Sequence, residues 1–404
     1  MKLLKVLIIG CLILFPFGEF LRLDIGTTVG IKPLDLLVGI TALVGSIWLI
    51  KQYIRKKSPD RLLKPILIVA SIGAIALLIN ITWLAPLEFF ISFLYLLRWI
   101  SYAMLLLIIL QFDKHFKQKL TWLLFFDGLF ILVIGYLQYF FFSSLKGWYH
   151  LGWDDHMYRM FSVFLDPNFA GGFFVLYFLF VAGLLFKKPH TGRRKQIMLL
   201  SLVLLLTLLA VFLTFSRAAL LMLIIGSGVL FFLLGKKKLF FLIIGVVILF
   251  FSAISSQFYI ENVNIFREAS SKARLENYAV AIQIIQERPL LGVGFNSYRY
   301  AKDLYGIKAG WTGAPSHADA GVDNSFLFVL ATTGVIGFGP YLWLWFCVFI
   351  RLRNERKKNL IFPTVAIASV LGLFVHALFI NSLFFAPLML WLFVLLGITL
   401  SSQP

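Results

Sequence analysis

Long apolar runs, separated by short polar and basic stretches, make up most of this chain. Many runs are close to ~20 residues, the length at which an α-helix crosses the hydrocarbon core of a bilayer. A membrane β-barrel would alternate apolar and polar residues instead, so the pattern predicts helices. We therefore expect an all-α polytopic membrane protein with about 12 transmembrane helices. The expected spans cover about 5–20, 32–50, 65–83, 87–112, 120–142, 169–186, two within 197–234, 239–255, 324–350, 361–379 and 385–400.

One apolar run, residues 197–234, is almost twice as long as a single crossing requires. Lys195 and Lys236 bracket it, and both are expected on the cytoplasmic side. We therefore predict a hairpin of two spans. Its turn, TFSRAAL, lies at the outer face and places Arg217 there.

The largest polar insertion follows the ninth span and covers residues 256–321. It is expected to be an extracytoplasmic helical loop between spans nine and ten. The chain then divides into transmembrane helices 1–9 in residues 1–255, the loop, and transmembrane helices 10–12 in residues 322–404.

A helix is predicted inside this loop, over residues 268–287, and Pro289 ends it. Arg267 and Arg274 are seven residues apart and lie near one face. They either snorkel from an amphipathic helix on the membrane or clamp phosphate, because guanidinium groups match phosphate oxygens in pairs. The predicted apolar stripe of this helix comprises Leu275, Tyr278, Ile282 and Ile285.

Composition is typical of a membrane protein, and the positions of the basic residues account for the net positive charge. Of 404 residues, 61% are hydrophobic and 14% charged, whereas about a quarter of a soluble domain is charged. The net charge of +19 does not indicate nucleic-acid binding, because most of the 37 Lys and Arg residues lie in clusters between spans. The positive-inside rule places these clusters, and with 12 spans both termini, in the cytoplasm. Cys11 and Cys347 lie in apolar runs and are expected to be packing residues.

Two further arginines are expected at the outer face, and they favour the phosphate interpretation. Arg217 sits at the head of an apolar hairpin, where an arginine is costly unless it is paired or faces water. Arg159 lies just before the sixth span. Four outer arginines would suit a diphosphate group. Alternatively, outer acids are their structural partners: Asp154, Asp155, Asp166 and Asp323.

Asp323 and Asn324 open the tenth span. Both residue types favour helix caps, and on spacing alone a cap is the better interpretation. The functional alternative is that Asp323 takes a proton from a sugar hydroxyl. His317 lies six residues upstream in a Gly/Ala-rich stretch, where a lone histidine is usually only solvated. No Cys–His cluster favours zinc and no Walker-type loop favours an ATPase, so we expect neither a metal nor a cofactor.

Four segments, in this order, resemble the O-antigen ligase and polymerase superfamily of polytopic membrane glycosyltransferases. They are RMFSVFLDPNFAGGF from Arg159, TFSRAALL around Arg217, ERPLLGVGFNSY after the loop helix, and Asn324 followed by nine residues, Gly334, two residues and Gly337. Ligase members of the family carry a histidine before this asparagine. Here that position is Asp323.

The resemblance implies an enzyme of the bacterial cytoplasmic membrane that uses a glycan on an undecaprenyl-diphosphate carrier. The glycan moves to a glycan or lipid acceptor without metal or nucleotide. Arg217 and Arg274 are then the best candidates to bind the diphosphate, where the charge of the leaving group develops. Asp323 is the candidate base. Other polysaccharide assembly proteins are candidate partners. The remaining candidate substrate-binding residues are Arg159, Arg267, Asn324 and His317, the last also an alternative base.

Several functions remain open at this point. The change from histidine to Asp323 favours a polysaccharide polymerase over an O-antigen-type ligase. A transporter or flippase of polyprenyl-linked glycans should show ionisable residues deep in several spans and two related halves. Arg98 is the main interior candidate, and no such halves are found. A non-catalytic assembly partner would need none of the arginines.

Overall fold

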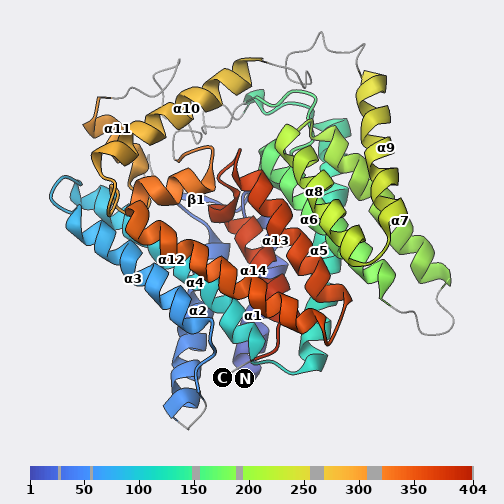
Figure 1. Ribbon diagram of the computed structural model, residues 1–404, viewed down its shortest axis with the longest axis horizontal. Helices are drawn as coiled ribbons and strands as arrows, with labels where there is room; N and C mark the ends of the chain where they lie inside the picture. The colour runs from blue at the N-terminus through green and yellow to red at the C-terminus, as the bar shows by residue number, and fades with distance from the viewer. Residues whose placement is uncertain are drawn as a thin grey trace.

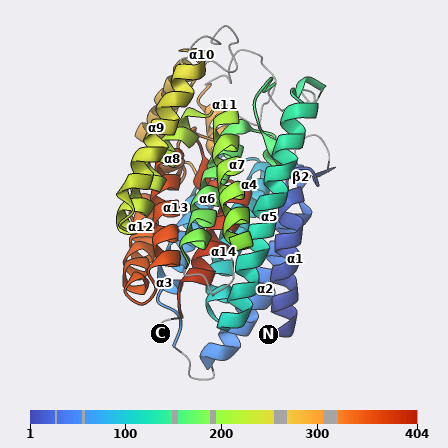
Figure 2. The same cartoon turned by 90° about the vertical axis from the view of Figure 1, so that its right-hand side faces the viewer.

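The computed structural model describes residues 1–25, 29–54, 58–147, 155–187, 194–254, 268–306 and 321–402, and these form a bundle of helices. Both termini lie at one end of the bundle, and α10 lies at the opposite end (Figures 1 and 2). The helices are α1 (Lys2–Leu14), α2 (Pro33–Ile54), α3 (Leu63–Ile79), α4 (Pro86–Leu110), α5 (Lys114–Phe141), α6 (Pro167–Phe186), α7 (Arg194–Leu213), α8 (Arg217–Leu233), α9 (Lys237–Ile254), α10 (Glu268–Glu287), α11 (Tyr298–Leu304), α12 (Ser325–Arg356), α13 (Ile361–Ala377) and α14 (Ala386–Thr399).

Many of these helices are suited to a bilayer. Among the described residues, α2, α4, α5, α6, α7 and α12 are long and apolar enough to cross a membrane, and α3, α8, α13 and α14 are shorter apolar helices. A polytopic helical membrane protein is therefore confirmed, while the count of 12 spans stays a prediction. A small antiparallel hairpin of β1 (Leu23–Ile25) and β2 (Val29–Ile31) is the one departure from an all-α chain among the described residues.

The run at residues 197–234 divides into two helices, α7 and α8, as the sequence predicts. The break covers Thr214 to Ser216. Phe215 has a positive φ of 49°, and the Ser216 hydroxyl caps α8 by accepting from Ala219 N. Arg217 is the first residue of α8, so the expected turn is where the sequence places it.

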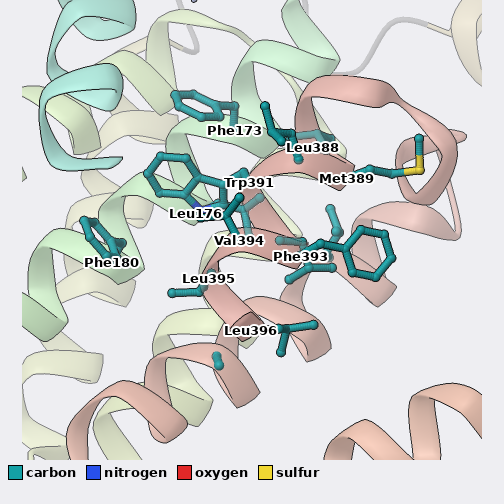
Figure 3. Packing of buried hydrophobic residues seen from close by; sticks show 14 of the residues in the cluster. Phe173, Leu176, Phe180, Leu388, Met389, Trp391, Phe393, Val394, Leu395 and Leu396 are labelled. Carbon is teal, nitrogen blue, oxygen red and sulfur yellow. The ribbon is translucent and has the colours of Figure 1, made fainter. Parts of the chain in front are cut away.

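The centre of the bundle is an aromatic cluster between α6 and α14. The Trp391 ring meets Phe173 edge-on at 5.1 Å and Phe180 at 5.4 Å between centroids (Figure 3). Small residues allow such close packing, as is usual between membrane helices. A Cβ at Gly128 of α5 would lie 2.2 Å from the Tyr177 ring, and the Tyr177 hydroxyl donates to the Phe125 carbonyl.

Arg98 inside the bundle is paired. Its guanidinium meets Asp35 of α2 at 3.0 Å and 2.8 Å, and the Tyr102 hydroxyl donates to the same carboxylate. An arginine is tolerated at such depth when its charge is compensated. Arg98 therefore holds α4 against α2.

A break in α12 receives the turn that follows α10. At Gly334 the backbone leaves the helix, with φ 62° and ψ −171°. Val335 N and Ile336 N then donate to the carbonyls of Pro289 and Leu290, while Val293 N and Gly294 N donate to those of Ala331 and Thr332. The groups released by the break are thus satisfied by the turn, as burial requires.

Glycine is needed on both sides of this junction. A Cβ at Gly334 would lie 2.1 Å from the Leu290 carbonyl oxygen, and one at Gly292, where φ is 64°, would lie 2.5 Å from that of Ala331. Two of the segments that carry the family resemblance, PLLGVG and the glycine pair of α12, therefore meet and fix α10 at the end of the bundle.

Candidate active site

Five helix ends and faces converge next to that junction. The N-termini of α6 and α8 are joined by the Ser216 hydroxyl, which donates to Asn168 Oδ1 over 3.0 Å. The end of α13 joins them through His376, whose Nε2 lies 3.1 Å from the Asn168 carbonyl oxygen. Tyr278 of α10 links α13 to the start of α12, because its hydroxyl is shared between the carbonyls of Leu378 and Asp323 at 2.6 and 3.2 Å.

Two glycines permit the close approach of α6. A Cβ at Gly171 would lie 2.6 Å from the Ala219 Cβ of α8, and one at Gly172 would lie 3.2 Å from the His376 ring. The AGG sequence in the Arg159 segment therefore sets how tightly α6 packs against α8 and α13.

Arg217 and Arg274 are close enough for their positive charges to repel each other. Arg217 opens α8, and Arg274 lies half-buried on α10. The positive charge of Arg274 acts repulsively on Arg217. Elements far apart in sequence thus bring two like charges within electrostatic range of each other, an arrangement that a bound anion would relieve.

Asp323 lies in the same field of charges. Burial raises the pKa of its carboxyl to about 6, against the opposing effect of Arg274, while Asp166 raises the pKa and Lys302 lowers it. Its backbone is fixed on both sides, because Asp323 N donates to Asn277 Oδ1 over 2.9 Å and its carbonyl accepts from Tyr278. A carboxyl with a pKa near 6 suits proton transfer near neutral pH.

The cap of α12 belongs to Asn324. Its Oδ1 accepts from Phe326 N at 2.9 Å and Leu327 N at 3.1 Å. The sequence left open which of Asp323 and Asn324 caps the helix, and the structure shows that Asn324 does. The chemical role of the Asp323 carboxylate stays a prediction.

Arg159 lies beneath the turn before α8. It is 5% exposed, and its Nε donates to the Thr214 carbonyl over 2.8 Å, with Nη2 3.4 Å from the Phe215 carbonyl oxygen. These bonds hold the turn from which Arg217 projects, so Arg159 is built into the support of the site.

Other candidates have different positions. Arg267, His317 and Asp154 lie outside the described residues. Asp166 caps α6, accepting from Asn168 N and Phe169 N, and Asp155 accepts from the Ser144 hydroxyl.

The predicted apolar stripe of α10 is wrong in part. The helix has the predicted bounds, but Leu275 and Ile282 are 67% and 48% exposed, whereas Ala281 and Ile284 are fully buried. They pack with Val293, Tyr298 and Phe328. The small Ala281 side chain lets α10 approach α12 closely, so the buried face is rotated from the one that residue size suggests.

Three site residues were missed by the sequence analysis. Asn168 had a signal, since it ends the DPN sequence in a segment that carries the resemblance. His376 had none, because a single histidine in an apolar run is usually a core residue. Lys302 is 7% exposed, lies under the Tyr298 ring and acts on Asp323. Its place in α11 gave no clue.

In the described part of the chain, no group of three His, Cys, Asp or Glu residues could hold a metal ion. The expectation that the protein uses no metal stays a prediction.

Sequence comparison supports the resemblance. Residues 202–342 match the family model described as O-antigen ligase. This range contains Arg217, Arg274, Asp323 and the Gly334 junction. No curated protein matches the chain. The match bears out membrane glycosyltransferase activity of the ligase and polymerase type in general, with lipid-linked glycans as substrates. Over residues 202–342, the chain is therefore similar to the O-antigen ligase family.

Proposed function

We propose that the protein polymerises an undecaprenyl-diphosphate-linked oligosaccharide at the outer face of the bacterial cytoplasmic membrane. The observation that carries this proposal is that Arg217 of α8 and Arg274 of α10 repel each other electrostatically, while the backbone of Asp323 is bonded to Asn277 and Tyr278 of the same α10. The end of the bundle with α10 then faces outwards, and the end with both termini faces the cytoplasm (Figure 2).

Arg217 and Arg274 bind the diphosphate of the donor. Guanidinium groups suit this role because they donate paired hydrogen bonds to phosphate oxygens. As the bond between the anomeric carbon and the phosphate oxygen breaks, its electron pair leaves on the diphosphate. The two fixed cations stabilise that charge in a partly dry site, and we expect no divalent ion to be required.

Asp323 accepts the proton of the acceptor hydroxyl as its oxygen forms the new bond to the anomeric carbon. The carboxyl later releases this proton to water. A single displacement of this kind inverts the anomeric configuration, which the product linkage reports.

The test uses the purified protein with undecaprenyl-diphosphate-linked repeat units, EDTA and no nucleotide. Lengthening of the lipid-linked glycan is the expected result. Folded protein that gives no lengthened product and no transfer to an added acceptor would refute the proposal.

An O-antigen-type ligase is the second candidate, because the matched family is described as a ligase. Its product differs: the glycan would appear on an added lipid or protein acceptor, with no growth of the donor-linked chain.

A further inference from the structure

Asn168 occupies the point where the site elements join. Its backbone N–H donates to Asp166 Oδ1 over 2.6 Å, its carbonyl lies 3.1 Å from His376 Nε2, and its Oδ1 accepts from Ser216 over 3.0 Å. Arg274 and Asp166 both act electrostatically on His376, and Ser216 directly precedes Arg217. Asn168 is thus bonded to Ser216, the residue before Arg217, and to His376, on which Arg274 acts electrostatically.

The orientation of the Asn168 amide follows from its partner. Ser216 Oγ already accepts from Ala219 N, so its single proton is available for Asn168 Oδ1. The other end of the amide, Nδ2, carries two N–H donors. Among the described residues, Nδ2 donates no hydrogen bond, and Asn168 is partly exposed. The amide therefore keeps two donors for a bound molecule.

His376 shows that the hydrogen bonding around Asn168 is incomplete. A carbonyl oxygen can only accept, so Nε2 carries the proton and Nδ1 has a lone pair. The His376 side chain is fully buried, and Nδ1 has no hydrogen-bond partner in the described part of the chain. A buried polar atom of this kind usually meets water or a ligand.

The surroundings favour an anion at this place. The N-termini of α6 and α8 meet here, and a helix N-terminus carries partial positive charge. The carboxylate of Asp166, two residues before Asn168, already accepts from Asn168 N and Phe169 N. Arg217 and Arg274 supply the full charges.

We propose that Asn168 is a further substrate-binding residue, which donates from Nδ2 to a phosphoryl oxygen of the diphosphate held by Arg217 and Arg274. This inference rests on the proposed function. The hydrogen bond from Ser216 orients the side-chain amide for that contact before the donor arrives, and His376 holds the main-chain carbonyl of Asn168.

The substitution Asn168→Asp separates this role from a purely structural one. Aspartate keeps Oδ1 for Ser216, loses both N–H donors and adds a negative charge. The control is Asn359→Asp, two residues before the start of α13, where Oδ1 likewise accepts one hydrogen bond, here from Ile361 N. Binding of undecaprenyl diphosphate is measured for the full chain in nanodiscs, with undecaprenol as the lipid without phosphate, and the melting temperature of each variant is recorded.

We expect Asn168→Asp to weaken undecaprenyl diphosphate binding by about ten- to a hundredfold, the value of one hydrogen bond to a charged group, while undecaprenol binding and the melting temperature stay near those of the wild type. Asn359→Asp should bind as the wild type does. Equal affinity of Asn168→Asp and wild type would overturn the inference alone. A wild type that binds undecaprenyl diphosphate no better than undecaprenol would overturn the proposed function as well.

A second pair keeps the test decisive if Asn168→Asp does not fold. Ser216→Ala removes the bond that orients the amide but keeps its donors, whereas Asn168→Ala removes both. If Nδ2 contacts the diphosphate, Asn168→Ala loses more affinity than Ser216→Ala. Equal losses would mean that the amide serves only as the partner of Ser216, contrary to the inference.

Discussion

Two arginines inside the bundle form ion pairs with carboxylates, whereas two arginines at its α10 end repel each other. Arg98 meets Asp35 through two nitrogens, and Arg351, 5% exposed, binds both oxygens of Asp60. Each of these charges has its counter-charge built into the fold. At the α10 end, Arg217 and Arg274 come from different elements and repel each other.

The difference distinguishes structural from functional charge. A closed, bidentate ion pair fixes two helices, and its removal acts on folding. Two like charges held together cost stability, which the fold tolerates where a ligand supplies the opposite charge. The following predictions test that distinction, from the largest expected effect to the smallest.

Loss of both site arginines should have the largest effect. The double variant Arg217→Ala with Arg274→Ala should lower the rate of glycan transfer by at least about a thousandfold, since one such donor is already worth a hundredfold or more. Arg217→Lys should also be poor, because a point charge does not replace the planar fork. Product formation by purified enzyme measures this.

The matched control replaces the internal pair instead. Arg98→Met with Asp35→Leu removes one arginine and its partner together, and apolar replacements of buried pairs are commonly tolerated. This variant should insert and retain activity. If it were as inactive as the Arg217/Arg274 variant, the distinction between the two regions would fail.

Asp323→Asn should lower kcat/KM by about a hundred- to ten-thousandfold, the usual value of a general base. In the wild type, only the deprotonated carboxylate accepts a proton. Because the pKa is raised to about 6, kcat/KM should rise with pH up to about 6 and level off above it. The variant should lack this inflection; a wild-type profile that is flat from pH 5 to about 8 would exclude Asp323 as the base.

Gly334→Ala should destabilise the junction between α12 and the turn after α10 by about 1–3 kcal/mol for the strained backbone, with a further cost for the steric clash. The added Cβ would lie 2.1 Å from the Leu290 oxygen, so Arg274 would lose its place and activity would fall. Gly339→Ala, five residues on in the same helix, meets nothing within 4 Å and should be tolerated. Thermal unfolding and activity of both variants provide the comparison.

The smallest effect separates two neighbouring residues. Asn324→Ala removes the cap of α12 and should cost about 1 kcal/mol of stability. Asp323→Ala leaves that cap in place and should act on rate with little change in melting temperature. If Asp323→Ala lowered the melting temperature more than Asn324→Ala, the assignment of the cap to Asn324 would be wrong.

Features set by local sequence were predictable. The end of α10 follows from Pro289, and the hairpin of α7 and α8 follows from the length of an apolar run. The Gly334 break was visible as a motif, but its partner, the turn at Pro289–Gly294, is a long-range contact that spacing does not reveal.

Features set by packing were not predictable. The buried face of α10 depends on Ala281, whose small size gives a weak signal. His376 and Asn168 are 208 residues apart, and only the approach of α6 to α13 at Gly172 joins them. Asp323 and Asn324 have similar capping preferences, so only the hydrogen bonds of Asn324 distinguish them.

The most direct test of the central claim is a cryo-EM structure of the full chain in nanodiscs with undecaprenyl diphosphate bound. The account predicts phosphoryl oxygens within about 3 Å of guanidinium nitrogens of both Arg217 and Arg274. A diphosphate bound elsewhere, or held by neither arginine, would contradict it.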